Sequence, residues 1–187
     1  MTNSLPVRKF ERVSKYKDIK LPIRATRFSA GYDIYSATTI SVPSIWRVLN
    51  ELTDQHVNPA LIKFNQALIR NLVKPTLVPT GIKVQMPRDN VLYLYNRSSN
   101  PLKRGLVLAN GVGIIDADYY NNKANKGEIF GSFYNFSVQD YTIHQGDAIM
   151  QGVFGTYLLA ENDNFVNNQR TGGFGSTDDW SINYRQC

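Results

Sequence analysis

The residues best suited to chemistry lie between positions 109 and 122, in the stretch ANGVGIIDADYYNN. A short apolar run with two glycines is followed by two carboxylates, Asp116 and Asp118, and then by a pair of tyrosines. The run is typical of a β-strand, and we expect it to be buried, with Asp116 at its end. A carboxylate held rigidly there is well placed to take a proton from water or from a substrate. The alternative is a hairpin with two solvated turn aspartates, the commoner meaning of an isolated Asp-x-Asp.

Two further segments carry groups that suit phosphate oxygens. Arg97, Ser98 and Ser99 follow the strand-like run VLYLYN and offer a guanidinium and two hydroxyls. Near the C-terminus, RTGGFGST at 170–177 combines an arginine, glycine N–H groups that can form an anion-binding nest, and an aromatic ring that can lie flat on a base. It is not a P-loop, because no lysine follows the glycines. A glycine-rich tail without a ligand is the alternative for this segment.

The composition indicates a globular domain. The chain has 187 residues, of which 42% are hydrophobic and 19% charged. Its only cysteine, Cys187, excludes an intrachain disulfide, and His56 and His144 show no metal-ligand spacing. The net charge is +6, and eight basic residues fall between positions 8 and 27. No aromatic platform or groove-reading motif accompanies them, so we expect a solvated basic face and no nucleic-acid partner.

The sequence also predicts where the protein resides. No apolar run approaches the roughly 20 residues that a membrane span needs. The N-terminal stretch MTNSLPVRKFERV lacks the apolar core of a signal peptide. We therefore expect no membrane contact and a cytoplasmic, intracellular location.

The elements that must position these groups are mostly strands. Short β-type runs broken by Gly, Pro, Asn and Asp fill the chain after position 74, which favours an all-β barrel or sandwich. Alternating residues predict one strand over 32–42, after a turn at Gly31. Segment 44–73 changes to helical spacing and predicts a pair of amphipathic helices, whose apolar stripe packs on the main domain or, as the alternative, binds a partner. From position 161 onward apolar residues thin out, which predicts a mobile C-terminal arm.

Five motifs in order, AGYDIYSA, NRSS, NGVGIIDADY, GDAIMQ and RTGGFGST, resemble those of the deoxyuridine triphosphatase (dUTPase) family of the trimeric, all-β kind. The resemblance covers residues 21–43 and 74–177. It implies a single domain over 1–187 with a dUTPase-like β-barrel of jelly-roll type, a helical insertion at 44–73, a mobile arm at 161–187, and a homotrimer. Viral and phage members often carry such additions, so the resemblance points to a phage or prophage origin.

The resemblance also implies an activity, which is hydrolysis of dUTP to dUMP and pyrophosphate with Mg²⁺. This reaction keeps uracil out of DNA and supplies dUMP for thymidylate synthesis. Asp116 would activate the water that attacks the α-phosphorus, Asn110 would hydrogen-bond uracil, and Tyr119 would pack on the deoxyribose where a 2′-hydroxyl would clash. Asp33 would hold Mg²⁺ through water. The other implied substrate-binding residues are Arg97, Ser98, Ser99, Gly113, Gln151, Arg170, Gly172, Gly173, Phe174, Gly175, Ser176 and Thr177, of which those from 170 on would form a lid with Phe174 over uracil.

Several positions depart from the family pattern. Asn121 stands where a glycine is usual, although asparagine tolerates a left-handed turn, and the loop before Gly127 is longer. Ala148 replaces a common arginine, and the tail motif is one residue shorter. Two alternatives stay open. One is a dCTP deaminase, which shares the fold and an RSS motif but would need a glutamate that only Glu128 could supply. The other is a regulatory protein on the same scaffold that binds a partner through the inserted helices.

Overall fold

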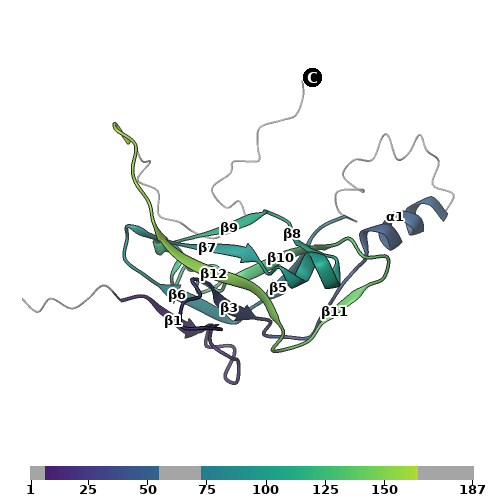
Figure 1. Ribbon diagram of the computed structural model, residues 1–187, viewed down its shortest axis with the longest axis horizontal. Coiled ribbons are helices and arrows are strands. Elements are labelled where there is room, and N and C mark those ends of the chain that lie inside the picture. Colours follow the sequence, from purple (N-terminus) through teal and green to yellow (C-terminus); the bar gives the residue numbers. More distant parts are fainter. Residues whose placement is uncertain (1–6, 55–72, 164–187) are drawn as a thin grey trace, which may run out of the picture.

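Short strands make up most of the described chain, as the turn-rich sequence predicts. The computed structural model describes residues 7–54 and 73–163 (Figure 1). The strands are β1 (Lys9–Arg12), β2 (Ile23–Arg24), β3 (Tyr32–Tyr35), β4 (Ile40–Val42), β5 (Thr76–Pro79), β6 (Ile82–Gln85), β7 (Asn90–Asn96), β8 (Leu106–Leu108), β9 (Val112–Asp116), β10 (Phe130–Asn135), β11 (Tyr141–Ile143) and β12 (Ala148–Thr156). One α-helix, α1 (Ile45–Asp54), lies among the described residues, together with a π-helical turn at Asn100–Arg104 and a 3₁₀ turn at Ala117–Tyr119.

The strands pair in four antiparallel sheets. The largest has the order β2-β3-β12-β7-β9, and the others are β5-β10-β8, β1-β6 and β11-β4. Buried apolar side chains from all four sheets join the same core cluster. Alternation along each strand explains this arrangement, since every second side chain of a strand points to the same face. In β10, for example, Gly131, Phe133 and Asn135 are buried while the residues between them are half-buried. This all-β core confirms the predicted fold class.

The segment 32–42 is not the single strand that its alternating pattern predicts. It forms β3 and β4, which belong to different sheets. Between them the chain bends at Ser36, whose hydroxyl donates a hydrogen bond to the carbonyl of Thr38 at 2.6 Å. A serine side chain that bonds the nearby backbone offers it an alternative to continued strand pairing. The alternation therefore persists through a corner at which the chain changes sheets.

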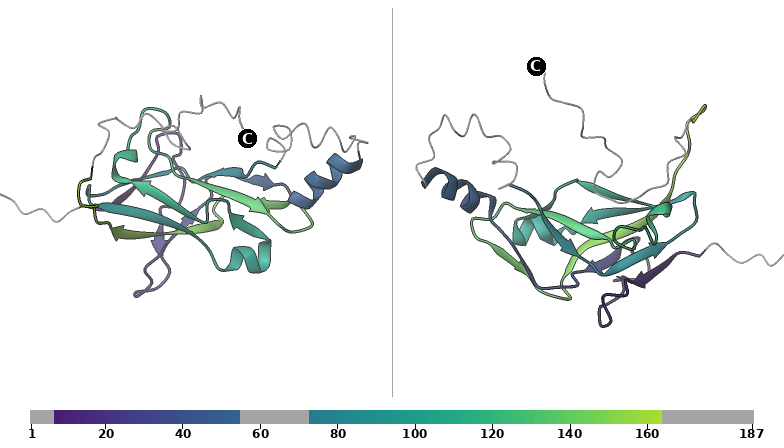
Figure 2. Two further views of the ribbon diagram at one scale, coloured as in Figure 1. Left: turned by 90° about the horizontal axis from the view of Figure 1, so that it is seen from above. Right: turned by 180° about the vertical axis from the view of Figure 1, so that it is seen from behind.

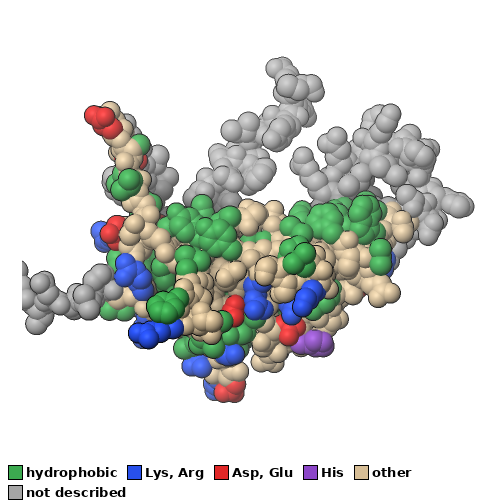
Figure 3. Space-filling view, viewed as in Figure 1, with side chains coloured by type: hydrophobic (Ala, Val, Ile, Leu, Met, Phe, Trp, Pro, Cys, Tyr) green, Lys and Arg blue, Asp and Glu red, His purple; other side chains and the backbone are tan. Residues whose placement is uncertain are grey.

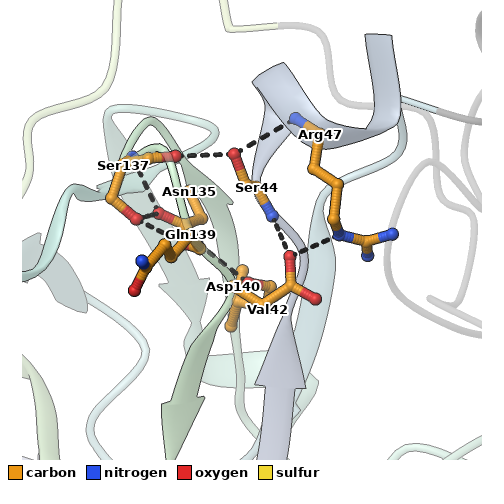
Figure 4. Close-up of polar contacts among 7 residues, drawn as sticks. All are labelled: Val42, Ser44, Arg47, Asn135, Ser137, Gln139 and Asp140. Atoms are coloured by element: carbon orange, nitrogen blue, oxygen red, sulfur yellow. Dashed lines mark hydrogen bonds and ion pairs between the residues drawn. The ribbon is translucent and has the colours of Figure 1, made fainter. Parts of the chain in front are cut away.

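The helix α1 extends from one end of the body that the strands form (Figure 2). Ser44 begins it in the usual way for an N-cap, because its hydroxyl accepts the backbone N–H of Arg47 at 3.3 Å. A polar network then ties this helix start to the segment after β10 (Figure 4). The Ser44 N–H and the Arg47 Nε both donate to one carboxylate oxygen of Asp140 at 2.8 Å, and the Ser44 hydroxyl donates to the carbonyl of Ser137 at 2.6 Å.

The helix α1 lies where the first of the two predicted helices is expected. That the segment 44–73 is an insertion stays a prediction. The second helix, and the apolar stripe expected on it, lie in segment 55–72, outside the described residues. Its packing and the partner-binding alternative for 44–73 stay predictions. Within the two ranges that the structure describes, no helix is long and apolar enough to span a membrane.

Candidate active site

Three of the expected site residues meet at one end of the large sheet. In the register of the strands, Gln151 of β12 lies between Asp33 of β3 and Tyr95 of β7. Arg97, which follows β7, places its Nε 3.2 Å from Asp33 Oδ1 and donates from Nη1 to the Ala148 carbonyl at 3.2 Å. The Arg97 side chain keeps 30% of its surface exposed, so this ion pair sits at the rim of the sheet and can meet an anion from solvent. We call Asp33, Arg97 and Gln151 the arginine cluster.

Gly31 leaves the room that the Gln151 side chain occupies. A Cβ built at Gly31 would overlap Gln151 Oε1 and lie 3.2 Å from its Cδ. The amide of Gln151 therefore lies against the backbone at Gly31, in the turn before β3. This close approach gives a physical reason for a glycine at that position.

The loop after Arg97 is held by a residue that the sequence analysis overlooked. Asn100 is fully buried, and its Nδ2 donates to Asn96 Oδ1 and to the Ile149 carbonyl, both at 2.7 Å. Asn100 follows directly after Ser98 and Ser99, and its two bonds link this loop to the end of β7 and to β12. Ser98 is exposed and Ser99 half-buried, so both hydroxyls lie at the surface beside Arg97. The asparagine itself is visible in the run NRSSNP, but its burial is known only from the structure.

A pocket of about 230 Å³ opens at the hairpin between β8 and β9. Asn110 and Gly113 line it together with apolar side chains of the surrounding strands, which are those of Leu94, Leu108, Ala109 and Phe130. Gly113 is packed tightly, since an added Cβ would lie 3.0 Å from Leu94 Cβ and 3.3 Å from Asn110 Nδ2. An apolar pocket with an amide at its rim suits a flat ring that carries hydrogen-bonding edges.

Asp116 ends β9 and is half-buried, at the point where the 3₁₀ turn begins. The prediction that the apolar run before Asp116 is buried is wrong. β9 is an edge strand of the large sheet, and Val112 and Ile114 are 41% and 60% exposed. Figure 3 shows apolar side chains gathered on the surface where β9 lies. An edge strand can contain the same apolar residues as a central strand, so an apolar run in the sequence does not by itself predict burial.

Tyr119 is buried, with 6% of its surface exposed, and its hydroxyl points into the protein. The hydroxyl donates to the Glu128 carbonyl at 3.1 Å and accepts a bond from Asn125 Nδ2 at 2.6 Å. The side chain is thus fixed at the end of the turn that starts at Asp116. Asn121, which follows two residues later, has a φ of 58°, in the left-handed region that asparagine tolerates.

The structure does not bring all these residues together within one chain. In the register of the sheet, Asp116 faces Val91 at the start of β7 and Gly113 faces Leu94, whereas Arg97 follows the end of β7. The Arg97 guanidinium contacts Asp33, which lies at the level of Tyr95, so four residues of strand, or about 13 Å, separate it from the level of Asp116. The two groups are also separated across the sheet, because β12 and β7 lie between β3 and β9. The pocket lies between these two levels. One chain therefore carries a base-sized pocket with a carboxylate on one side, and a separate arginine cluster on the other.

The remaining site predictions lie outside the described residues. They concern the C-terminal arm from position 164, with Arg170, Gly172, Gly173, Phe174, Gly175, Ser176 and Thr177. Only residues 161–163 of the predicted arm are described.

The donor set fits a cation held through water. Among the described residues, no group of three or more His, Cys, Asp or Glu side chains could enclose a metal ion. One oxygen of Asp33 is already bound to Arg97, so this carboxylate has few oxygens to offer. Such a site suits Mg²⁺, which keeps several waters and binds through one or two carboxylates together with phosphate oxygens.

The chain is similar to enzymes of nucleotide metabolism. A family model described as dUTPase matches residues 62–178. A deoxyuridine 5′-triphosphate nucleotidohydrolase of Lactococcus lactis is 43% identical over 92% of this chain and 99% of its own length, and one of Desulfitobacterium hafniense is 34% identical over 94% and 97%. The chain belongs to the dUTPase family.

Solved structures agree with this assignment. The dUTPase of Streptococcus mutans superimposes with a TM-score of 0.65 at 37% identity, over 82% of this chain and 98% of that one. A dUTPase from phage phi11 of S. aureus, in which a species-specific insert is seen, superimposes with a TM-score of 0.59 over 85% of this chain and 96% of that one. At 19% identity the phage structure supports the fold alone.

Proposed function

We propose that this protein hydrolyses dUTP to dUMP and pyrophosphate. The observation that carries the proposal is the β8–β9 hairpin, which presents the pocket lined by Asn110 and Gly113 and ends in Asp116. The Asn110 amide would hydrogen-bond the edge of uracil inside the pocket. Three residues of strand separate Gly113 from Asp116, or about 10 Å, so one short strand can set the base and the catalytic carboxylate relative to each other.

The chemistry needs a base and charge neutralisation. Asp116 would accept a proton from a water molecule, whose oxygen attacks the α-phosphorus while the bond to the oxygen that bridges to the β-phosphorus breaks and pyrophosphate leaves. Mg²⁺ bound with the triphosphate would neutralise phosphate charge, and Asp33 would hold it through water. Arg97, with Ser98 and Ser99, would bind phosphate oxygens and align them for in-line attack.

A complete site needs more than one chain. A nucleotide whose base fills the pocket and whose α-phosphorus reaches Asp116 points away from the arginine cluster of the same chain. Asp33 and Gln151 of that cluster lie at the level of Tyr95, four residues or about 13 Å from the level of Asp116 along the strands, and on strands that do not neighbour β9. The cluster of a second copy would then supply the phosphate contacts. This agrees with the homotrimer that the family resemblance implies, with the C-terminal arm as a lid. Because the substrate belongs to the intracellular nucleotide pool, a cytoplasmic location forms part of the same proposal. A phage origin stays a prediction from the family resemblance.

The dCTP deaminase alternative depends on Glu128 as its candidate acid. Glu128 is 6% exposed, and its carboxylate accepts the backbone N–H of Gly81 at 3.2 Å, in the turn between β5 and β6. Burial raises the pKa of the Glu128 carboxyl. Its side chain bonds that turn and does not line the pocket at Asn110 and Gly113, which favours the hydrolase over the deaminase.

The test is pyrophosphate release from dUTP, dTTP, dCTP and UTP with Mg²⁺. The wild type should act selectively on dUTP, and Asp116→Asn should lower kcat by at least about a hundredfold, the usual contribution of a general base. Asp118→Asn is the matched control, since it removes the neighbouring, exposed carboxylate and should keep most of the activity. A folded wild type that releases no pyrophosphate from dUTP would refute the proposal. Equal losses of kcat in the two variants would show that Asp116 is not the general base.

A further inference from the structure

The positive charge of this protein is concentrated near the N-terminus. Of the chain's 21 basic and 15 acidic residues, residues 8–27 hold eight basic ones and only two acidic ones, Glu11 and Asp18. This segment alone therefore accounts for the net charge of +6, and the basic and acidic residues of the remaining chain balance each other. The Glu11 carboxylate is in turn bound to Lys9 at 2.9 Å. Such a local excess of positive charge attracts polyanions.

A tight turn at the end of this segment presents two of its residues to solvent. Residues 24–28, at the end of β2 and in the loop that leads to β3, are all exposed. Thr26 and Ser29 close the turn, because the Thr26 carbonyl accepts the Ser29 N–H at 3.3 Å and the Ser29 hydroxyl at 3.0 Å. The Ser29 hydroxyl accepts the Thr26 N–H at 3.3 Å. Arg27 and Phe28 are the two central residues, so their side chains lie at the tip of the turn.

Arg24 fixes the turn to the body of the protein. Its Nη1 donates to two backbone carbonyls of the turn, at 2.9 and 3.2 Å. Its guanidinium carbon lies 6.0 Å from the centroid of the Tyr32 ring, in the range of a cation–π contact. The Tyr32 ring packs in turn against the rings of Phe10 and Phe154. The turn is therefore held in one shape by hydrogen bonds and by an aromatic cluster below it.

Phe28 offers a free aromatic surface beside these cations. Its side chain is 90% exposed, and the guanidinium carbon of Arg27 lies 5.5 Å from the centroid of its ring. The sequence analysis expected a solvated basic face because no aromatic platform accompanied the basic residues, and the structure supplies such a platform. Since the turn is already ordered, little conformational entropy is lost when a ligand binds it. A ring beside cations suits single-stranded nucleic acid, because any base can stack on the ring while the cations contact phosphates.

We propose that the turn Thr26–Ser29 binds single-stranded nucleic acid. One base stacks on Phe28, and Arg24, Arg27 and the basic residues before them contact the phosphates. The binding does not depend on the base, because every base has a face that can stack. This inference goes beyond dUTP hydrolysis and uses none of the residues assigned to the pocket, to Asp116 or to the arginine cluster.

The test is the fluorescence anisotropy of a labelled oligothymidylate of about 16 nucleotides, titrated with the protein while a dUTP analogue that cannot be hydrolysed fills the nucleotide site. The wild type should bind the oligothymidylate and lose affinity between about 50 and 200 mM salt. Phe28→Ala should weaken binding about tenfold at every salt concentration, because it removes the stacking ring and no charge. Arg27→Ala should reduce the slope of log K against log salt by about 0.7, the value for one phosphate contact of a single strand.

Three controls separate stacking from charge. Phe28→Trp keeps an aromatic ring and should bind like the wild type. Lys103→Ala removes one exposed charge outside this turn and should change neither the affinity nor the salt slope. A DNA duplex should bind Phe28→Ala and the wild type equally, because its bases are already stacked. The substituted side chains are exposed, so the variants should fold, and thermal unfolding checks this.

The inference is wrong if the wild type does not bind the oligothymidylate at about 50 mM salt. It is also wrong if Phe28→Ala binds like the wild type, or if Lys103→Ala weakens binding as much as Arg27→Ala, since charge alone would then explain the affinity. Polyglutamate that displaces the label as well as unlabelled oligothymidylate does would indicate an acidic protein as the partner instead. A wild type that binds the oligothymidylate but releases no pyrophosphate from dUTP would overturn the proposed function alone.

Discussion

Gly113→Ala tests the pocket directly, because the structure shows what the added methyl group meets. The new Cβ would lie 3.0 and 3.1 Å from two carbons of Leu94 and 3.3 Å from Asn110 Nδ2. Leu94 is 3% exposed and packed in the core, so it cannot retreat, and the amide of Asn110 must move instead. Overpacking of this kind costs about 1–3 kcal/mol. If about 2 kcal/mol of this is lost from nucleotide binding, kcat/KM for dUTP falls about thirtyfold.

The assay is steady-state pyrophosphate release at a temperature well below the unfolding transition, together with thermal unfolding. Val78→Ala is the matched control, since Val78 is fully buried in β5 and does not line the pocket. It should destabilise the protein by on the order of 2 kcal/mol and leave the KM for dUTP unchanged. If Gly113→Ala binds and hydrolyses dUTP like the wild type, the pocket is not the base site. If both variants raise KM equally, lost stability explains the effect.

Two further outcomes follow from polar contacts away from the pocket. Asn100→Ala removes both hydrogen bonds that link the loop to β7 and β12, and it leaves buried acceptors unpaired. The free energy of unfolding, measured by denaturant titration, should therefore fall by about 2–4 kcal/mol. A loss below about 0.5 kcal/mol would contradict the role given to this residue. The hydrogen bond from Arg47, with that from the Ser44 N–H, lowers the pKa of Asp140. A carboxyl whose pKa is lower in the folded state adds stability above its unfolded pKa, near 3.9, and loses it as the pH falls through the folded value. The difference in Tm between wild type and Asp140→Asn should therefore be present at pH 7 and shrink below about pH 4, and a difference that is constant over this range would refute the assignment.

The sequence predicts the strands well because their signals are local. Short alternating runs end at Gly, Pro and Asn, and the observed β5, β6, β7 and β12 follow them. Helix α1 is equally clear, since an N-cap serine precedes an apolar stripe. Where the prediction fails, the deciding contact is distant in sequence. The exposure of Ile114 depends on β9 being at the sheet edge, and the break in segment 32–42 depends on which sheet each half joins.

The candidate site shows the same division. The types of Asp116, Arg97 and Asn110 are visible in the motifs. The structure places Asn110 and Gly113 in the lining of one pocket, and their substrate-binding roles stay predictions. The spacing along β7 between Asp116 and Arg97 is not visible, because it depends on the register of β9 against β7. The role of Asn100 is hidden for a related reason. An asparagine in a polar loop looks solvated until the partners of its amide are known.

The distance between Asp116 and the arginine cluster has a genetic consequence. If each site borrows its cluster from a neighbouring copy, a substitution at Asp116 and one at Arg97 damage different halves of the site. A host that carries one gene of each kind would assemble mixed oligomers, in which some sites combine the two undamaged halves. Two alleles that are each inactive alone would then complement each other inside one molecule, and selection would act on the population of subunits in a cell as well as on each gene.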